Sequence, residues 1–322
     1  MNASRRSVLA AAGLLLPLST ARAALPDRPV RLVLGFPAGS GPDLVGRMLA
    51  DGLREAWPAG VVVDNRPGAA GAIAAQEVAR AAPDGTTLLF GEVGQLAMAP
   101  STYARLPYDP ARDFAAVAEV AAIDFAFVVP ASLPVTDLAG YVAWGRARPT
   151  VFMGTFGAGT PGHFGAAMLA NAAGLRHEAV HFRATGDAMT AILGGDVQGM
   201  FGSLALVAPH VQAGRLRALA VSGPERAAML QGVPTLAEGG FGAIGFHSWF
   251  GLVAPAATPV STVASLEAGV LSAMAAAPLR ARMAEAGFRP AGRGRDAFAT
   301  LMRDETRRWA EVVRATGFRA IE

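Results

Sequence analysis

The chain contains neither cysteine nor lysine. The absence of cysteine from its 322 residues excludes disulfides, thiolate catalysis and a lipid-attached N-terminal cysteine. All 28 basic residues are arginine, which excludes a P-loop lysine and a Schiff-base lysine. Arginine does not titrate below about pH 12, so an isoelectric point of ≈ 10.1 does not indicate a nucleic-acid partner, and none is expected. Charged residues make up 16% of the chain against 52% hydrophobic ones, enough for a substantial core.

Residues 1–23 have the pattern of an export signal. Arg5-Arg6 lie in a twin-arginine motif, followed by the apolar run Leu9–Leu18 and a small-x-small cleavage site that ends at Ala23. The run is too short to span a bilayer. Val8 stands where twin-arginine signals usually carry Phe, so the general secretion route stays open. Cleavage near Ala23 would leave 25 arginines against 25 acids, and we expect the mature chain in the periplasm.

Strand and helix patterns alternate along most of the chain, which predicts an α/β fold. Two long apolar segments, Ala116–Val129 and Phe246–Ala254, are long enough to pass from one domain to another and back. Helices are predicted over 43–57, 69–81, 135–148, 163–173, 187–193, 260–276, 279–286 and 296–316, with a short helix after Leu236. Strands are predicted over 30–36, 60–63, 86–90, 150–156, 178–182, 197–201 and 216–221.

Two stretches about 120 residues apart share one pattern. The strand pattern Val30–Phe36 runs into the loop Pro37–Pro42, and the strand pattern Thr150–Phe156 runs into the loop Gly157–Gly162; a helix follows each loop. A helix N-terminus has unpaired N–H groups and a partial positive charge, and glycine lets the backbone approach a ligand. The pair predicts one small anion bound from two sides.

The second loop also fits the dinucleotide-binding pattern G-x-G-x-x-G. It lies between a strand and a helix, and Glu178 follows Gly157 by 21 residues. Against this interpretation, the loop is in mid-chain and Pro161 falls where the helix of that motif opens. An exported NAD(P)-dependent oxidoreductase that uses Gly157–Gly162 remains the alternative function, and a tight turn without ligand is a further possibility.

Two other motifs carry less weight. His177–His181 fits H-E-x-x-H, which binds zinc only on a helix. The segment is predicted as a strand, where the two imidazoles would lie roughly 13 Å apart. Ser40 is a conceivable nucleophile, but no histidine lies near it in sequence and no G-x-S-x-G motif occurs. We therefore predict no catalytic residue and no metal.

Several pieces of the chain, taken in order, form a specific set. They are Phe36-Pro37-Ala38-Gly39 with Asp43, Val63–Ala69 with Gly71, Ala82–Gly85 with Thr87-Leu88-Leu89, Leu106–Pro110 with Asp113-Phe114, Leu193–Gly195 with Val197, Arg217–Val221, Val233–Glu238, Ser248–Leu252 and Arg308-Trp309. The ordered set resembles the Bug-type (TctC-like) periplasmic solute-binding receptors of tripartite tricarboxylate transport systems.

This resemblance implies a type II periplasmic-binding-protein (Venus-flytrap) fold of two lobes joined by two crossings. Lobe 1 would contain residues 24–123 and 248–322, and lobe 2 residues 124–247. The family implies no catalysis, cofactor or metal. The expected function is extracytoplasmic capture of a small organic carboxylate for uptake or sensing, with membrane subunits of a tripartite transporter as possible partners. We expect a monomer.

The resemblance also implies a set of ligand contacts. Arg183 is the expected charged contact, since a guanidinium can pair with a carboxylate through two hydrogen bonds. In lobe 1 the contacts are Phe36, Ala38, Gly39, Ser40 and Gly94. In lobe 2 they are Phe156, Gly157, Gly159, Thr160, His163, Phe182, Arg183 and Ala184.

The chain departs from the family pattern mainly in lobe 2. Ser40 replaces a second glycine and Pro42 a threonine, whereas the lobe 2 changes are His181, Asp187, Ala184 and Gly202-Ser203. The wall formed by lobe 2 is therefore where specificity is expected. Glu92 and Asp187 are two acids near the expected site, and one hypothesis is that they meet an amine or other donor on the ligand. The alternative is that both face solvent.

Overall fold

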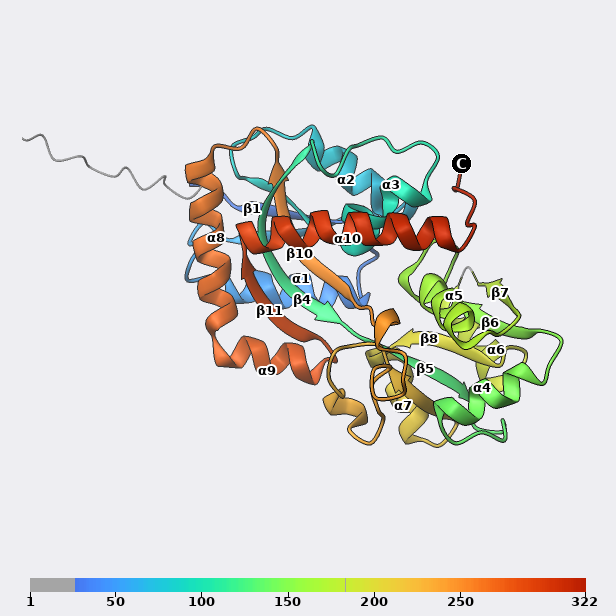
Figure 1. The fold of residues 1–322 in the computed structure, drawn as a ribbon. Helices are drawn as coiled ribbons and strands as arrows, with labels where there is room; N and C mark the ends of the chain where they lie inside the picture. The colour runs from blue at the N-terminus through green and yellow to red at the C-terminus, as the bar shows by residue number, and fades with distance from the viewer. Residues whose placement is uncertain (1–26, 183) are drawn as a thin grey trace, which may run out of the picture.

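Two separate β-sheets organise the chain, one in each lobe (Figure 1). The computed structural model describes residues 27–182 and 184–322. The predicted export signal and Arg183 lie outside the described residues.

The first sheet combines strands from both ends of the chain, in the order β11-β4-β10-β3-β1-β2. β1 pairs in parallel with β2 and β3, whereas β10 is antiparallel to β3 and β4, and β11 is antiparallel to β4. The strands are β1 (Val30–Leu34), β2 (Val61–Asn65), β3 (Thr87–Glu92), β4 (Phe114–Ile123), β10 (Ser248–Pro255) and β11 (Arg289–Gly294).

The second sheet has the order β7-β6-β8-β5-β9. β6 is parallel to β7 and β8, and β5 is antiparallel to β8 and β9. Its strands are β5 (Phe125–Pro130), β6 (Val151–Thr155), β7 (His177–His181), β8 (Gly199–Ser203) and β9 (Leu216–Val221).

Helices cover both faces of the sheets, as expected for strands that are apolar on both sides. The α-helices are α1 (Gly41–Gly52), α2 (Ala72–Ala79), α3 (Ala99–Thr102), α4 (Leu138–Arg146), α5 (Pro161–Ala173), α6 (Thr185–Gly194), α7 (Leu204–Gln212), α8 (Val260–Ala275), α9 (Ala277–Glu285) and α10 (Arg295–Ala315). The shorter elements are the 3₁₀ turns η1 (Ala69–Gly71), η3 (Ala228–Leu230) and η4 (Gly242–Ile244) and the π-helical segment η2 (Gly94–Met98).

β1 divides the core of lobe 1 between its two faces. Leu32 and Leu34 pack with α1, α8 and α9, whereas Val33 packs with α2, η2 and α10. In the part of the chain that the structure describes, no single helix is long and apolar enough to cross a bilayer; α8 and α9 meet that criterion only jointly, across a 72° bend.

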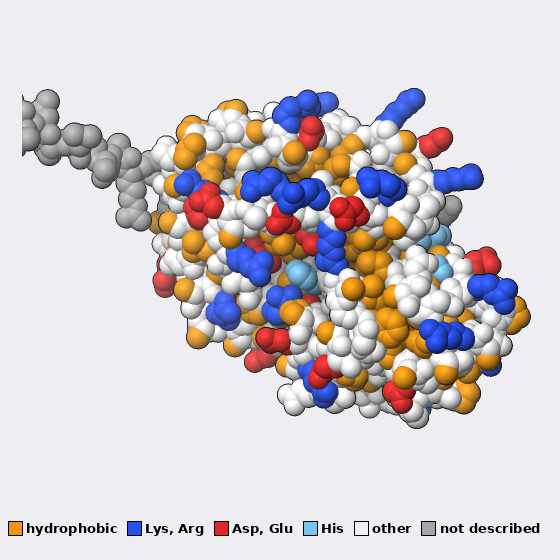
Figure 2. Space-filling model, viewed as in Figure 1, with side chains coloured by type: hydrophobic (Ala, Val, Ile, Leu, Met, Phe, Trp, Pro, Cys, Tyr) orange, Lys and Arg blue, Asp and Glu red, His pale blue; other side chains and the backbone are white. Residues whose placement is uncertain are grey.

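Helix α10 connects the two lobes. It lies along the first sheet and ends beside α5 (Figure 1). The ring of Trp309 is fully buried, 6.0 Å from the ring of Phe164 in α5 and 6.4 Å from that of Phe246. The outward side of α10 bears charges of both signs, including the exposed ion pair Arg307–Asp304 (Figure 2).

The chain passes between the lobes twice, as the two long apolar segments predicted. Asp124 alone separates β4 from β5, and residues 222–247 lead from β9 back to β10. The Ser222 N–H donates to the Phe125 carbonyl at 2.8 Å and so joins the return passage to the first, and within the return passage the Phe246 N–H donates to the Ser222 carbonyl at 3.1 Å. The predicted two-lobed α/β fold is confirmed.

Some predicted elements were wrong. No helix follows Leu236, because Gly239 and Gly240 interrupt that stretch, Gly240 with φ +86°, and a turn leads into η4 instead. The helix predicted from 69 begins at 72, since Ala69 and Ala70 have φ of +45° and +50°. The helix predicted over 43–57 ends at Gly52. The prediction also missed η2, α3, α7 and β11.

Gly251 in β10 provides a test of the packing of α10 on the first sheet. A Cβ added there would lie 2.2 Å from Phe298 Cζ and 2.8 Å from the Ala118 carbonyl oxygen. We expect Gly251→Ala to lower the free energy of unfolding by about 1–3 kcal/mol, because the backbone oxygen cannot move away. Urea unfolding followed by circular dichroism measures the change.

Gly186→Ala is the matched control. Gly186 lies in α6, and nothing is within 4 Å of its added Cβ. The change should leave stability unaltered or raise it by up to about 1 kcal/mol, because alanine favours the helix. A Gly251→Ala protein as stable as the wild type would contradict the packing described for β10 and α10.

Candidate ligand-binding site

The two glycine loops share the backbone conformation of their second-last residue before the helix. Gly39 and Gly159 have φ of +80° and +75°, values that favour glycine. The N–H of Gly39 donates to Asp43 Oδ2 at 2.8 Å, and the N–H of Gly159 donates to His163 Nδ1 at 3.1 Å. In both loops, therefore, a side chain in the first turn of the helix fixes the amide four residues before it.

A hydroxyl closes each loop in the same way. Ser40 Oγ donates to the Pro37 carbonyl at 2.6 Å, and Thr160 Oγ1 donates to the Gly157 carbonyl at 2.9 Å. Both residues are extended and precede the first residue of a helix, α1 or α5. The shared pattern that the sequence indicated is thus a shared structure.

Asp43 anchors the first loop from inside lobe 1. Its carboxylate is 3% exposed and also accepts from Arg47 Nε and Asn65 Nδ2, each at 2.9 Å. Asn65 donates further to the Phe36 carbonyl at 3.0 Å. Burial acts to raise the pKa of Asp43, but the bonds from Arg47, Gly39 and Asn65 outweigh it and lower the pKa below its usual range.

His163 anchors the second loop as a neutral ring. It is 9% exposed, and its ring centroid lies 4.6 Å from that of His181 and 5.6 Å from that of Phe318. Burial, and then the neighbouring His181 and His177, lower the pKa of His163 to about 4. At neutral pH, Nδ1 can therefore accept the hydrogen bond from Gly159.

A cavity of about 80 Å³ lies between the lobes at the second loop. Lobe 2 contributes the loop tip and the start of α5, and lobe 1 contributes the end of β3, η2 and the segment after it. The lining residues are Ala69, Ala70, Ala72, Glu92, Gly94, Ala99, Thr102, Tyr103, Leu106, Tyr108, Ala158, Gly159, Thr160 and Pro161.

Three of the predicted contacts, Gly94, Gly159 and Thr160, come together in this cavity. The first-loop residues Phe36, Ala38, Gly39 and Ser40 are not among its lining residues. The preceding residue, Gly35, packs against the neighbours of lining residues: a Cβ added to it would be 2.6 Å from both Gly71 Cα and Gln95 Nε2. The contact of the first-loop residues with a ligand stays a prediction.

The other predicted contacts in lobe 2 have different surroundings. Phe156 and Phe182 pack against the apolar cluster around Met200. The Gly157 carbonyl accepts the hydrogen bond from the Thr160 hydroxyl within the loop. Ala184 is exposed just before α6. Arg183 lies outside the described residues, so its pairing with a carboxylate is untested.

Several lining residues were missed, including Thr102, Tyr103 and Tyr108. They follow η2, an element that no periodicity indicated. Gln95 fixes this region from within, because its Nε2 donates to the Gly71 carbonyl at 2.9 Å and its own carbonyl accepts from the Tyr108 hydroxyl at 2.9 Å. The Leu106–Pro110 motif marked this region as family-like, but nothing in it points to a cavity wall.

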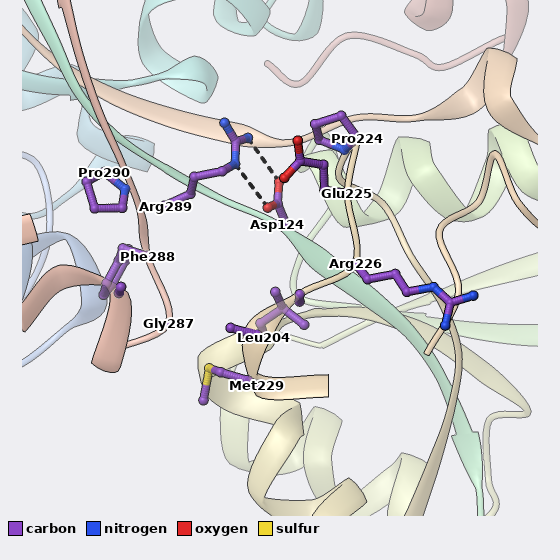
Figure 3. A pocket seen from close by; sticks show the side chains of 13 residues that line it. Asp124, Leu204, Pro224, Glu225, Arg226, Met229, Gly287, Phe288, Arg289 and Pro290 are labelled. Atoms are coloured by element: carbon purple, nitrogen blue, oxygen red, sulfur yellow. Dashed lines mark hydrogen bonds and ion pairs between the residues drawn. The ribbon is translucent and has the colours of Figure 1, made fainter. Parts of the chain in front are cut away.

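A second crevice, of about 200 Å³, opens beside the first crossing (Figure 3). Arg289 and Asp124, which both line it, form an ion pair with an N–O distance of 3.2 Å. Arg226, which also lines it, pairs with Glu238 at 2.9 Å. Both guanidinium groups already have carboxylate partners, so this crevice is less suited to an organic anion than the cavity at the second loop.

Comparison with known proteins identifies the family. The model of the tripartite tricarboxylate transporter family receptor matches residues 45–318. The chain belongs to this family. Protein BugT of Bordetella pertussis is 30% identical over 311 residues, which cover 96% of this chain and 95% of BugT.

Two solved structures of Rhodopseudomonas palustris proteins have the fold of this chain. A Rhodopseudomonas palustris protein solved with adipate is 31% identical, with a TM-score of 0.82, over 92% of this chain and 99% of its own. MatC of Rhodopseudomonas palustris, with bound malate, is 29% identical, with a TM-score of 0.76, over 90% of this chain and 100% of its own.

Membership in a receptor family overturns the oxidoreductase alternative. The geometry also opposes it. In a dinucleotide-binding unit, the ribose-binding acid follows the second strand at its carboxyl end. Glu178 instead is the second residue of β7 and pairs with Phe152, at the far end of β6 from the glycine loop. The segment His177–His181 is a strand, as predicted.

Asp43 provides a test of the first loop. Asp43→Asn retains the size of the side chain but replaces one of its two acceptor oxygens by an amide nitrogen, while three donors still face the group. We expect the free energy of unfolding at pH 7 to fall by about 1–3 kcal/mol. Because the folded pKa of Asp43 is lowered, this stabilisation is present above its ordinary pKa and disappears as pH falls. The difference in free energy of unfolding between Asp43→Asn and the wild type should therefore become smaller below about pH 4.

Urea unfolding at pH 7 and near pH 3.5 measures that gap. Asp51→Asn is the control, since Asp51 pairs with Arg54 on the surface and its side chain is 48% exposed. A surface pair contributes little, so the control should match the wild type at both values. An Asp43→Asn protein with a gap of equal size at both pH values would refute the role given to the carboxylate.

Proposed function

We propose that this protein is an extracytoplasmic solute-binding receptor that captures a small organic carboxylate between its lobes. The observation that carries this proposal is the interlobe cavity, in which the start of α5 faces the end of β3. The related structures with adipate and malate support a carboxylate as the ligand. The protein binds and releases its ligand without chemistry.

The chemistry of the cavity fits binding by backbone dipoles. None of the described lining residues is an arginine or a histidine. The N-terminus of the 13-residue helix α5 supplies a partial positive charge, although Pro161 has no N–H and the His163 N–H already donates to Thr160 Oγ1 at 3.4 Å. A carboxylate at Gly159 and Thr160 would be stabilised by this partial charge, directly or through water, with Arg183 as a charged partner, and Gly94 would contact the ligand from lobe 1.

The family also supports where the protein works and with what. Its members are receptors of tripartite transporters, so the proposed partners are membrane subunits of such a system. Closure of the lobes on the ligand would form the surface that these subunits recognise. The proposed site of action is the periplasm, after cleavage near Ala23, with the receptor as a monomer.

A thermal-shift screen against mono-, di- and tricarboxylates tests the proposal. A ligand present at about 100 times its Kd should add about 2.7 kcal/mol to the free energy of unfolding. Small-angle scattering should record a smaller radius of gyration with the same ligand. A full library without a stabilising compound would contradict the proposed function.

Ala158 locates the binding site experimentally. It is exposed at the tip of the second loop and lines the cavity, so a large side chain can enter the cavity without disturbing a core. We expect Ala158→Trp to retain the melting temperature of the ligand-free protein and to weaken ligand binding at least tenfold, as isothermal calorimetry would measure.

Ala213→Trp is the matched control, because Ala213 is exposed just after α7 and lines none of the cavities described above. Its affinity should equal that of the wild type. If Ala158→Trp also bound the ligand with unchanged affinity, the ligand would have to lie elsewhere than in the cavity at the second loop.

A further inference from the structure

Glu92 places a carboxyl group in the cavity where an organic anion is expected to bind. It ends β3, and Gly94 follows it at the start of η2. A Cβ added to Gly94 would lie 2.7 Å from Glu92 Oε1, so the carboxyl lies directly over the bare face of that glycine. Both residues line the cavity opposite Ala158–Pro161.

No cation of the described residues neutralises this carboxyl. Among the described residues, Glu92 forms no ion pair. Burial raises the pKa of Glu92 to about 7, with the Ser248 hydroxyl acting in the opposite direction. An acid held in this state is costly unless a ligand supplies the missing partner.

Three of the four hydroxyl groups that line the cavity donate their protons to backbone carbonyls. Tyr108 donates to the Gln95 carbonyl at 2.9 Å, Thr102 to the Met98 carbonyl at 3.2 Å, and Thr160 to the Gly157 carbonyl at 2.9 Å. Each hydroxyl has one proton, so lone pairs are what remains for a ligand. In the wall formed by lobe 1, Tyr108 and Thr102 are therefore acceptors toward a ligand.

We propose that the ligand carries a protonated amine that meets Glu92, with its carboxylate at the start of α5. The ligand class is then an amino-carboxylate rather than a plain di- or tricarboxylate. This inference rests on the proposed function, which concerns the carboxylate end of the ligand, and it specifies the chemistry of the other end. The rings of Tyr103 and Tyr108 in the same wall suit an ammonium group as well.

An arrangement in which Glu92 donates a proton to the ligand would lead to a different effect of Glu92→Gln on binding. If Glu92 were protonated and donated to a second ligand carboxylate, glutamine would replace it well, because its amide also donates. An amine needs the carboxylate itself. Glu92→Gln therefore separates the two arrangements while retaining the size of the side chain.

Four matched pairs of compounds provide the test: butyrate and 4-aminobutyrate, pentanoate and 5-aminopentanoate, succinate and aspartate, and glutarate and glutamate. Isothermal calorimetry at pH 7.5 measures each affinity. In the wild type we expect the amino member of at least one pair to bind at least tenfold more tightly than its partner. In Glu92→Gln that advantage should fall to less than threefold.

Two further variants sharpen the result. Asp187→Asn removes the other acid that the sequence singled out; Asp187 is exposed and does not line the cavity, so the amine preference should persist. Gly94→Ala displaces the Glu92 carboxyl through the 2.7 Å contact and should weaken the amino ligand as Glu92→Gln does.

The pH dependence provides an independent measurement. Among the described residues, the groups beside Glu92 are Ser248, Gln95, Tyr103 and Tyr108, and burial raises the pKa of both tyrosines, so none of these titrates between pH 6 and 8. An aliphatic ammonium with a pKa near 10 also stays charged. Affinity for the amino ligand should rise as pH increases from 6 to 8 in the wild type and stay flat in Glu92→Gln.

The outcomes separate the two proposals. If amine-free carboxylates bind as tightly as their amino partners, or if Glu92→Gln leaves the preference intact, the amine inference is wrong and the proposed function stands. If affinity falls as pH rises, Glu92 donates a proton to the ligand and the inference is again wrong. If no compound of either kind stabilises the protein, the proposed function fails, and this inference fails with it.

Discussion

The hydrogen bond from a loop glycine to the side chain four residues ahead is the constraint on which both halves of the site depend. It holds Gly39 and Gly159 at positive φ just before a helix begins. The acceptors differ in charge. In lobe 1 the start of α1 already has an anion, the Asp43 carboxylate, whereas in lobe 2 a neutral His163 leaves the start of α5 free for one. This difference makes the start of α5 the better place for the anionic group of a ligand.

The fold was largely predictable because its signals are local. Apolar strands, amphipathic helices and glycine loops recur at spacings that the backbone itself dictates. The failures have equally physical causes. Pro209 lies inside α7 although it lacks an N–H, and β11 contains Pro290 and two glycines, so propensity opposes both elements. Packing and sheet pairing with β4 outweigh that local preference.

The site was predictable only where residues close together in the sequence form it. The second loop and Gly94 were found because a turn before a helix leaves a pattern in the sequence. Tyr103 and Tyr108 were not, because their positions depend on the π-helical segment η2 and on the hydrogen bonds of Gln95, which join parts of the chain 24 and 13 residues apart. Such bonds follow from tertiary packing and have no periodicity of their own.

The C-terminal segment contacts both lobes beside the site. The Ile321 N–H donates to the Thr102 carbonyl at 2.8 Å, and the Ala104 N–H donates to the Ile321 carbonyl at 2.9 Å, so the tail belongs to lobe 1. The tail meets lobe 2 at Gly159, where an added Cβ would lie 3.4 Å from Ile321 Cδ1. Phe318 of the tail also packs on lobe 2, with its ring 5.6 Å from that of His163 and 5.3 Å from that of Phe164, so withdrawal of the second loop would also separate these rings. The wall that includes Glu92 and Thr102 would then stay whole in lobe 1, ready for the next ligand.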